Sequence, residues 1–161
     1  MGGPARGASG DSSVLIPPVK VYRKNGAARL PRYASSGAAG ADVAACIEGD
    51  VVVAPGKRAK IPTGLALEIP AGWEAQVRPR SGLAWKEGLT VINAPGTIDS
   101  DYRGELEILL VNLGSENCII RNGERIAQLV FAPAPQLAFT ETGEIAASGR
   151  GEGGFGSTGS V

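Results

Sequence analysis

Histidine is absent from all 161 residues of the chain. This absence excludes the commonest general base, the Ser-His and Cys-His nucleophile pairs, and the usual zinc ligand. Any catalysis by proton transfer is therefore expected to depend on a carboxylate.

Cysteine is also scarce, because only Cys46 and Cys118 occur and both lie in apolar stretches. Two such thiols are typical of small core residues rather than of a disulfide framework, which favours a reducing, cytoplasmic environment. The first ten residues, MGGPARGASG, lack the apolar segment of a signal peptide. No run approaches the roughly 18 apolar residues of a membrane span, so no membrane partner is expected.

The chain has no excess of charge of either sign, with 16 basic and 16 acidic residues. A balanced chain has no overall field that would attract nucleic acid or an anionic surface, so no nucleic-acid partner is predicted. Any phosphate binding would have to be local.

Long uninterrupted segments are missing too, since 24 glycines and 11 prolines leave no stretch free of both that exceeds nine residues. This spacing excludes long helices almost everywhere. The segments between the breaks are rich in Val, Ile and Leu, which predicts an all-β, jelly-roll-like barrel. These segments lie at 14–16, 19–22, 42–53, 59–69, 73–79, 89–92, 104–112, 117–120 and 125–131, and are expected to supply many short strands. Several of these are apolar on nearly every residue, which predicts an oligomer that covers their second face.

The domain organisation predicted from this pattern is one barrel at 14–138 with an arm at each end. Residues 1–13 are expected to be a disordered extension. Residues 139–161 form the expected flexible C-terminal arm, which ends in SGRGEGGFGSTGSV. One helical turn is expected at 81–86, with Ser81 as its N-cap.

Four polar clusters interrupt the apolar pattern, and each has a purely structural alternative. In SSGAAGADVAA, residues 35–45, Asp42 either opens a strand or holds metal-bound water. In RPRSGLA, residues 78–84, the arginines and Ser81 either form a capped turn or donate hydrogen bonds to phosphate.

The third cluster, NAPGTIDSDYRGE at 93–105, is expected to be a β-hairpin. Acidic residues are common in turns, which is the structural interpretation of this cluster. A carboxylate held next to an apolar strand, as expected for Asp99, could also act as a general base that activates water. In the fourth cluster, GERIAQLVF at 123–131, Arg125 and Gln128 interrupt the apolar run and need partners, structural or ligand. The Gly-rich tail is either a linker or an anion-wrapping segment.

Together these segments resemble the trimeric dUTP diphosphatase (dUTPase) family. The resemblance covers about residues 30–159 and rests on five segments, AGADV, RPRSGLA, NAPGTIDSDYRG, GERIAQLVF and RGEGGFGSTG. It implies a homotrimer with active sites at subunit interfaces that hydrolyses dUTP to dUMP and pyrophosphate with Mg²⁺. Such an enzyme limits uracil incorporation into DNA and supplies dUMP for thymidylate synthesis.

The resemblance also implies roles for single residues. It implies that Asp99 activates the attacking water, assisted by Gln128, and that Asp42 reaches Mg²⁺ through water. Uracil and deoxyribose would be bound by Asn93, Gly96, Thr97, Ile98, Tyr102 and Phe155. The phosphates would be bound by Arg80, Ser81, Gly82, Gln128, Arg150, Gly156, Ser157 and Thr158. Arg125 is expected to hold the surrounding residues in position rather than to contact the substrate.

Two alternative functions stay open at this point. A dCTP deaminase, or a bifunctional deaminase and diphosphatase, would share the barrel, but such enzymes carry a glutamate where this chain has Leu109. A non-catalytic nucleotide-binding scaffold would keep the fold without turnover. Such a scaffold would tolerate the loss of Asp99, which this chain has kept.

Overall fold

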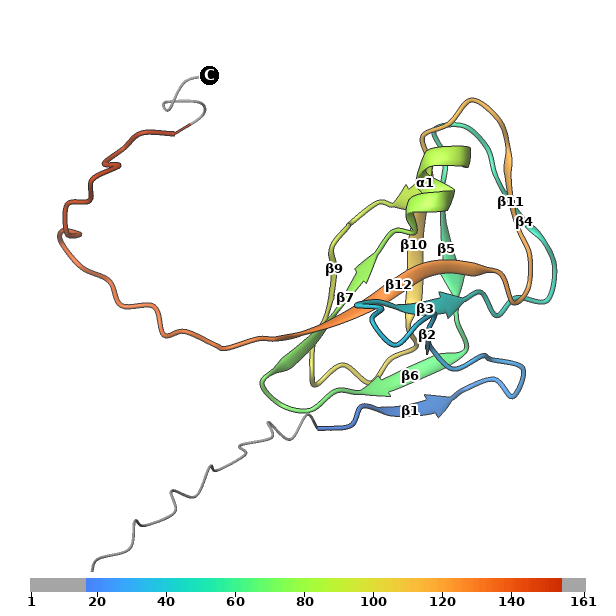
Figure 1. The fold of residues 1–161 in the computed structure, drawn as a ribbon, viewed down its shortest axis with the longest axis horizontal. Helices are drawn as coiled ribbons and strands as arrows, with labels where there is room; N and C mark the ends of the chain where they lie inside the picture. Colours follow the sequence, from blue (N-terminus) through green and yellow to red (C-terminus); the bar gives the residue numbers. More distant parts are fainter. Residues whose placement is uncertain (1–16, 155–161) are drawn as a thin grey trace, which may run out of the picture.

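The computed structural model describes residues 17–154, which form short strands and a single seven-residue helix (Figure 1). The expected mostly β, jelly-roll-like fold is confirmed. In chain order the elements are β1 (Lys20–Arg23), β2 (Arg32–Tyr33), β3 (Ala41–Ala44), β4 (Val51–Val53), β5 (Arg58–Pro62), β6 (Leu65–Glu68), β7 (Trp73–Arg78), α1 (Ser81–Glu87), β8 (Leu89–Val91), β9 (Gly96–Ile98), β10 (Glu107–Asn112), β11 (Cys118–Ile120) and β12 (Arg125–Pro133).

The strands form four antiparallel sheets whose neighbours are mostly distant in sequence. The largest has the order β2-β3-β12-β7-β9, and a second has the order β5-β10-β8. The pairs β1-β6 and β4-β11 complete the body. After β12 the chain leaves the body as an extended segment, seen in orange to red in Figure 1. Within residues 17–154 no helix is long and apolar enough to cross a membrane.

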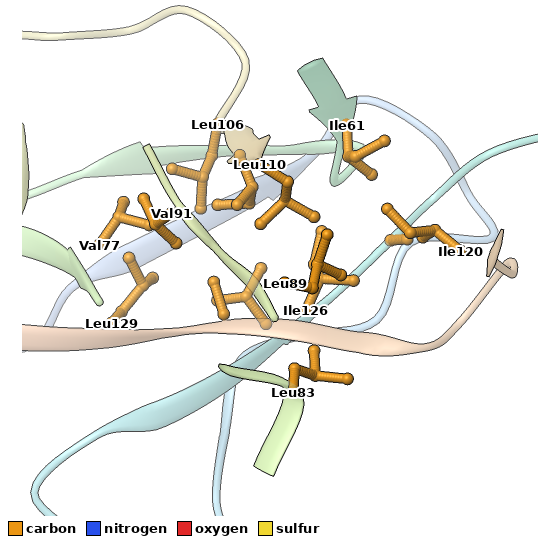
Figure 2. Packing of buried hydrophobic residues seen from close by; sticks show 14 of the residues in the cluster. Ile61, Val77, Leu83, Leu89, Val91, Leu106, Leu110, Ile120, Ile126 and Leu129 are labelled. Carbon is orange, nitrogen blue, oxygen red and sulfur yellow. The ribbon is translucent and has the colours of Figure 1, made fainter. Parts of the chain in front are cut away.

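The core lies between the sheets and is built from aliphatic side chains (Figure 2). Strand β10 shows why the sequence folds this way, because Ile108 and Leu110 alternate with more exposed neighbours and are at most 1% exposed. This period of two matches the alternation of side chains along a strand. Both cysteines are buried free thiols, as expected, and burial raises the pKa of Cys118.

Some apolar side chains remain uncovered in the single chain. Leu109 on β10 is 37% exposed, Leu113 after it is 71% exposed, and Trp85 on α1 is 90% exposed. A single copy therefore leaves part of its apolar surface uncovered. The sequence predicts that an oligomeric partner covers the second face of such strands.

The structure corrects two local expectations. Ser81 is not an N-cap, because the extended Arg80 takes that position, makes no side-chain cap, and leaves Ser81 as the first helical residue. Residues 93–105 do not form a hairpin of their own, because β9 pairs with β7 in a different sheet from β8. The expected strand at 14–16 lies outside the described residues.

Asn112 is a fully buried polar residue at the end of β10. Its side chain forms hydrogen bonds with β4 and with the loop that follows β10. Its Nδ2 donates to the carbonyl oxygens of Val53, at 2.8 Å, and Glu116, at 2.7 Å. Its Oδ1 accepts from the backbone N–H of Gly114 at 2.8 Å. The buried amide thus satisfies three backbone groups, of which the Val53 carbonyl is itself buried.

Replacing Asn112 by alanine should lower the free energy of unfolding by about 2 to 4 kcal/mol, because three hydrogen bonds are lost and a cavity is left in place of the buried amide. Denaturant unfolding at fixed protein concentration measures the change. Asn117→Ala, at an exposed position nearby, is the matched control and should change stability by less than about 0.5 kcal/mol. Equal stability of the two variants would contradict this role for Asn112.

Candidate active site

Asp42, Gln128 and Arg78 lie in one row across the five-stranded sheet. The register pairs Asp42 with Gln128, and Gln128 with Arg78. Directly paired residues point to the same face of a sheet. The adjacent row, which contains Leu129 and Val77, points into the core. Asp42, Gln128 and Arg78 therefore share the outer face.

The Asp42 carboxylate is the centre of this cluster and is only 7% exposed. Arg125 Nη1 donates to Oδ2 at 2.8 Å, and Gln128 Nε2 donates to Oδ1 at 3.1 Å. Arg80 Nε lies 3.3 Å from Oδ1. A carboxylate has about four lone-pair sites, so these three donors leave capacity for one further donor such as water.

Gly40, in the AGADV segment, allows Gln128 to lie beside Asp42. A Cβ at Gly40 would lie 3.1 Å from the Cβ and Oε1 of Gln128, which is closer than most real contacts. The glycine two residues before Asp42 is therefore explained by its close packing against the Gln128 side chain of β12.

Arg80 connects the cluster to the start of α1. Its Nη1 donates to the carbonyl oxygen of Arg125 at 2.8 Å. The next two residues, Ser81 and Gly82, begin the helix and are both exposed. The structure thus brings the sequence-predicted Asp42, Arg80, Ser81, Gly82 and Gln128 to one region of the surface.

A second site surrounds Asp99 and is a hollow of about 270 Å³. It gathers the other described residues that the sequence predicts for base and sugar binding. Its lining comprises Lys60, Val77, Asn93, Gly96, Thr97, Ile98, Asp99, Tyr102, Glu105, Glu107 and Leu109.

Tyr102 is held in a fixed orientation at the edge of this hollow. Its hydroxyl donates to the carbonyl oxygen of Glu105 at 3.0 Å. A Cβ on Gly104 would overlap the tyrosine ring, so only glycine permits this close packing. The tyrosine remains 43% exposed, so part of its apolar ring surface is uncovered.

Sequence reasoning missed Lys60 and Glu107, which form an ion pair of 2.9 Å in the lining of the same hollow. The hydrogen bond from Lys60 to Glu107 raises the pKa of the lysine. The two residues are 47 positions apart and meet because β5 pairs with β10. No local pattern in the sequence could have identified this pair.

The two sites are far apart within one chain. Asp99 follows Ile98, which pairs with Ala75, whereas Gln128 pairs with Arg78. The register therefore separates Asp99 from Gln128 by about 13 Å along the strands and about 10 Å across them. One water molecule cannot contact both side chains of the same copy.

The C-terminal arm carries the remaining predicted residues. Among them, Arg150 is exposed, and its Nε donates to the carbonyl oxygen of Gly153 at 2.7 Å. It lies on the segment that leaves the body after β12 (Figure 1). Phe155, Gly156, Ser157 and Thr158 lie outside the described residues.

Comparisons with known proteins agree with this arrangement. The dUTPase family model matches residues 27–159, and the chain belongs to the dUTPase family. A deoxyuridine 5'-triphosphate nucleotidohydrolase of Mesorhizobium japonicum is 54% identical over 160 residues, covering 97% of this chain and 99% of that protein.

Solved structures show the same likeness. The Staphylococcus bacteriophage 80alpha dUTPase with dUpNHpp has a TM-score of 0.78 at 29% identity, covering 88% of this chain and 98% of that one. A mutant dUTPase from phage phi11 of S. aureus, whose structure describes the coordination of a structural Mg(II) ion, has a TM-score of 0.73 at 25% identity. It covers 80% of this chain and 98% of that one.

Replacing Asp42 by asparagine should lower the free energy of unfolding by about 1 to 3 kcal/mol, because two arginines lose a charged acceptor. Urea unfolding at fixed protein concentration measures the change. Asp50→Asn is the control, since Asp50 lies 3.8 Å from Arg121 in an exposed pair. It should change stability by less than about 0.5 kcal/mol. An Asp42→Asn variant as stable as the unmodified protein would refute the structural role of this carboxylate.

Proposed function

We propose that the protein hydrolyses dUTP to dUMP and pyrophosphate, with water attacking the α-phosphorus. The observation that carries this proposal is the grouping of the family-matched residues into two sites of different chemistry. One site is an acidic hollow with an aromatic edge, and the other is a carboxylate surrounded by arginines. The first suits a nucleoside and the second suits phosphates.

Asp99 is the proposed general base for the attacking water. It is exposed at the end of β9 and lines the hollow, so both substrate and water can reach its carboxylate. The absence of histidine supports the choice of a carboxylate. Gln128, which contacts Asp42, is proposed to orient the same water.

Recognition of the nucleoside is proposed to use the hollow around Asp99. The backbone of Gly96 to Ile98, together with Asn93, would form hydrogen bonds with uracil and leave no room for a 5-methyl group. The ring of Tyr102 would pack under the deoxyribose and exclude a 2′-hydroxyl. The constrained position of Tyr102 supports this selection by shape.

The phosphates are proposed to bind Arg80, Ser81, Gly82 and Gln128. Mg²⁺ fits this site through Asp42 and water, because the carboxylate keeps a free acceptor position and Mg²⁺ usually retains several waters. Within residues 17–154 no group of three His, Cys, Asp or Glu side chains could hold a metal directly. When bound, the ion would neutralise charge on the phosphate oxygens.

A homotrimer is proposed to complete each site with residues from different copies. The separation of Asp99 from Gln128 within one chain supports this, since both are proposed to contact one water molecule. The uncovered Leu109, Leu113 and Trp85 supply apolar surface for such contacts.

The C-terminal arm is proposed to close over a neighbouring copy's site. Phe155 would stack on uracil, while Arg150, Gly156, Ser157 and Thr158 would bind the γ-phosphate. The departure of the chain from the body after β12 supports an arm that reaches another copy (Figure 1). Closure would exclude water during the reaction.

In the cell the reaction would keep uracil out of DNA and supply dUMP for thymidylate synthesis. We place the enzyme in the cytoplasm, which its two buried free thiols support. The deaminase alternative is disfavoured because Leu109 lines the Asp99 hollow where the deaminases carry a glutamate.

The direct test is product analysis with dUTP, dCTP, dTTP and UTP in turn, with Mg²⁺ and then with a chelator. Metal-dependent formation of dUMP and pyrophosphate from dUTP alone is expected. Release of ammonia from dCTP would instead indicate deamination, and binding of dUTP without turnover would indicate a scaffold.

Asp99→Asn should lower kcat for dUTP by about 100-fold to 10,000-fold with little change in dUTP binding, because the amide cannot accept a proton from water. Steady-state kinetics and a binding titration measure the two effects. Asp50→Asn, remote from both sites, should keep full activity. An active Asp99→Asn variant would exclude Asp99 as the base.

A further inference from the structure

The structure contains a hollow of about 470 Å³ on the β2 side of Asp42, which we call the arginine hollow. Among the described residues, three arginines and one carboxylate line it; Arg29 and Arg32 come from the segment around β2, and Arg125 comes from β12. Its lining comprises Arg29, Leu30, Arg32, Ala34, Asp42, Ala44 and Arg125.

Arg32 extends the row of side chains that contains Asp42 and Gln128. The register of β2 and β3 pairs Arg32 directly with Asp42, and that of β3 and β12 pairs Asp42 with Gln128. Paired residues share a face and have Cβ atoms about 5 Å apart. Arg32 therefore projects from the same outer face as the proposed phosphate-binding cluster.

The charge in the arginine hollow is not balanced by protein groups. Asp42 already accepts from Arg125 and Gln128 and lies 3.3 Å from Arg80. Arg29 donates one hydrogen bond, from Nη1 to the carbonyl oxygen of Gly123 at 3.0 Å, which fixes its position. Among residues 17–154 the exposed Arg32 side chain has neither a hydrogen bond nor an ion pair within the chain.

Clustered guanidinium groups repel one another, and a bound anion offsets that repulsion. Guanidinium is planar and donates paired hydrogen bonds, which match phosphate oxygens well. Asp42 and Arg125 belong both to the lining of the hollow and to the proposed phosphate-binding cluster, so the two are adjacent. Its position therefore suits the outer part of a ligand whose inner phosphate lies at Arg80 and Gln128.

We propose that the arginine hollow binds the pyrophosphate portion of a nucleoside triphosphate, and the pyrophosphate product, through Arg32 with support from Arg29. The inference rests on the proposed function for the identity of the anion. It adds Arg32 and Arg29 to the phosphate-binding residues, although neither belongs to the five sequence segments that indicate the family.

The experiment is a calorimetric titration of the full chain with inorganic pyrophosphate, with and without Mg²⁺. Arg32→Met removes the charge and keeps an apolar side chain of similar reach. It should weaken pyrophosphate binding about tenfold, as expected for the loss of a charge-assisted pair. Arg32→Lys keeps the charge without the planar group and should show a smaller loss.

Arg23→Met is the matched control, because Arg23 is an exposed arginine on β1, in another sheet. It should leave pyrophosphate affinity unchanged. Wild-type affinity in Arg32→Met, or an equal loss in Arg23→Met, would overturn the proposal. Arg32 is exposed, and thermal unfolding of each variant verifies that it folds.

Kinetics with dUTP separate this inference from the proposed function. Arg32→Met should raise KM for dUTP and make pyrophosphate a weaker inhibitor. If the unmodified protein binds pyrophosphate through Arg32 but hydrolyses no dUTP, the proposed function fails and the anion site stands. If it hydrolyses dUTP and Arg32→Met changes neither KM nor inhibition, only the inference fails.

Discussion

The arrangement of the proposed phosphate-binding site depends on the buried carboxylate of Asp42. Its partners come from β12 and from the residue before α1, so one charged group fixes two elements relative to β3. Burial of a carboxylate is costly unless donors compensate it, and here arginine and amide groups supply them. The same arginines leave a positive surface around the carboxylate, which makes this structural centre suitable for binding phosphates.

A second constraint is the position of this centre relative to Asp99. The order β3-β12-β7-β9 separates them by intervening strands, and the register moves Asp99 further along the sheet. A single copy therefore holds the two parts of the proposed active site without joining them. The exposed apolar residues on β10 and α1 offer surface for the proposed association between copies, which would link assembly to catalysis.

Local features were predictable from the sequence, whereas contacts between distant strands were not. The frequent glycines and prolines and the β-branched segments indicated short strands, and the polar clusters indicated Asp42 and Asp99 as candidate site residues. The expected hairpin was wrong because β9 pairs with β7, a choice made by long-range packing. Lys60 and Arg32 were missed for the same reason, since each joins its site only through pairing with another strand.

The central claim is that one active site takes Asp99 from one copy and Gln128 from another. The most direct measurement is dUMP formation by mixed oligomers, made by refolding equal amounts of Asp99→Asn and Gln128→Ala chains together. The account predicts about a quarter of the unmodified activity, because random assembly joins the two intact parts in one site of four. Activity no greater than that of the two variants refolded separately would contradict it.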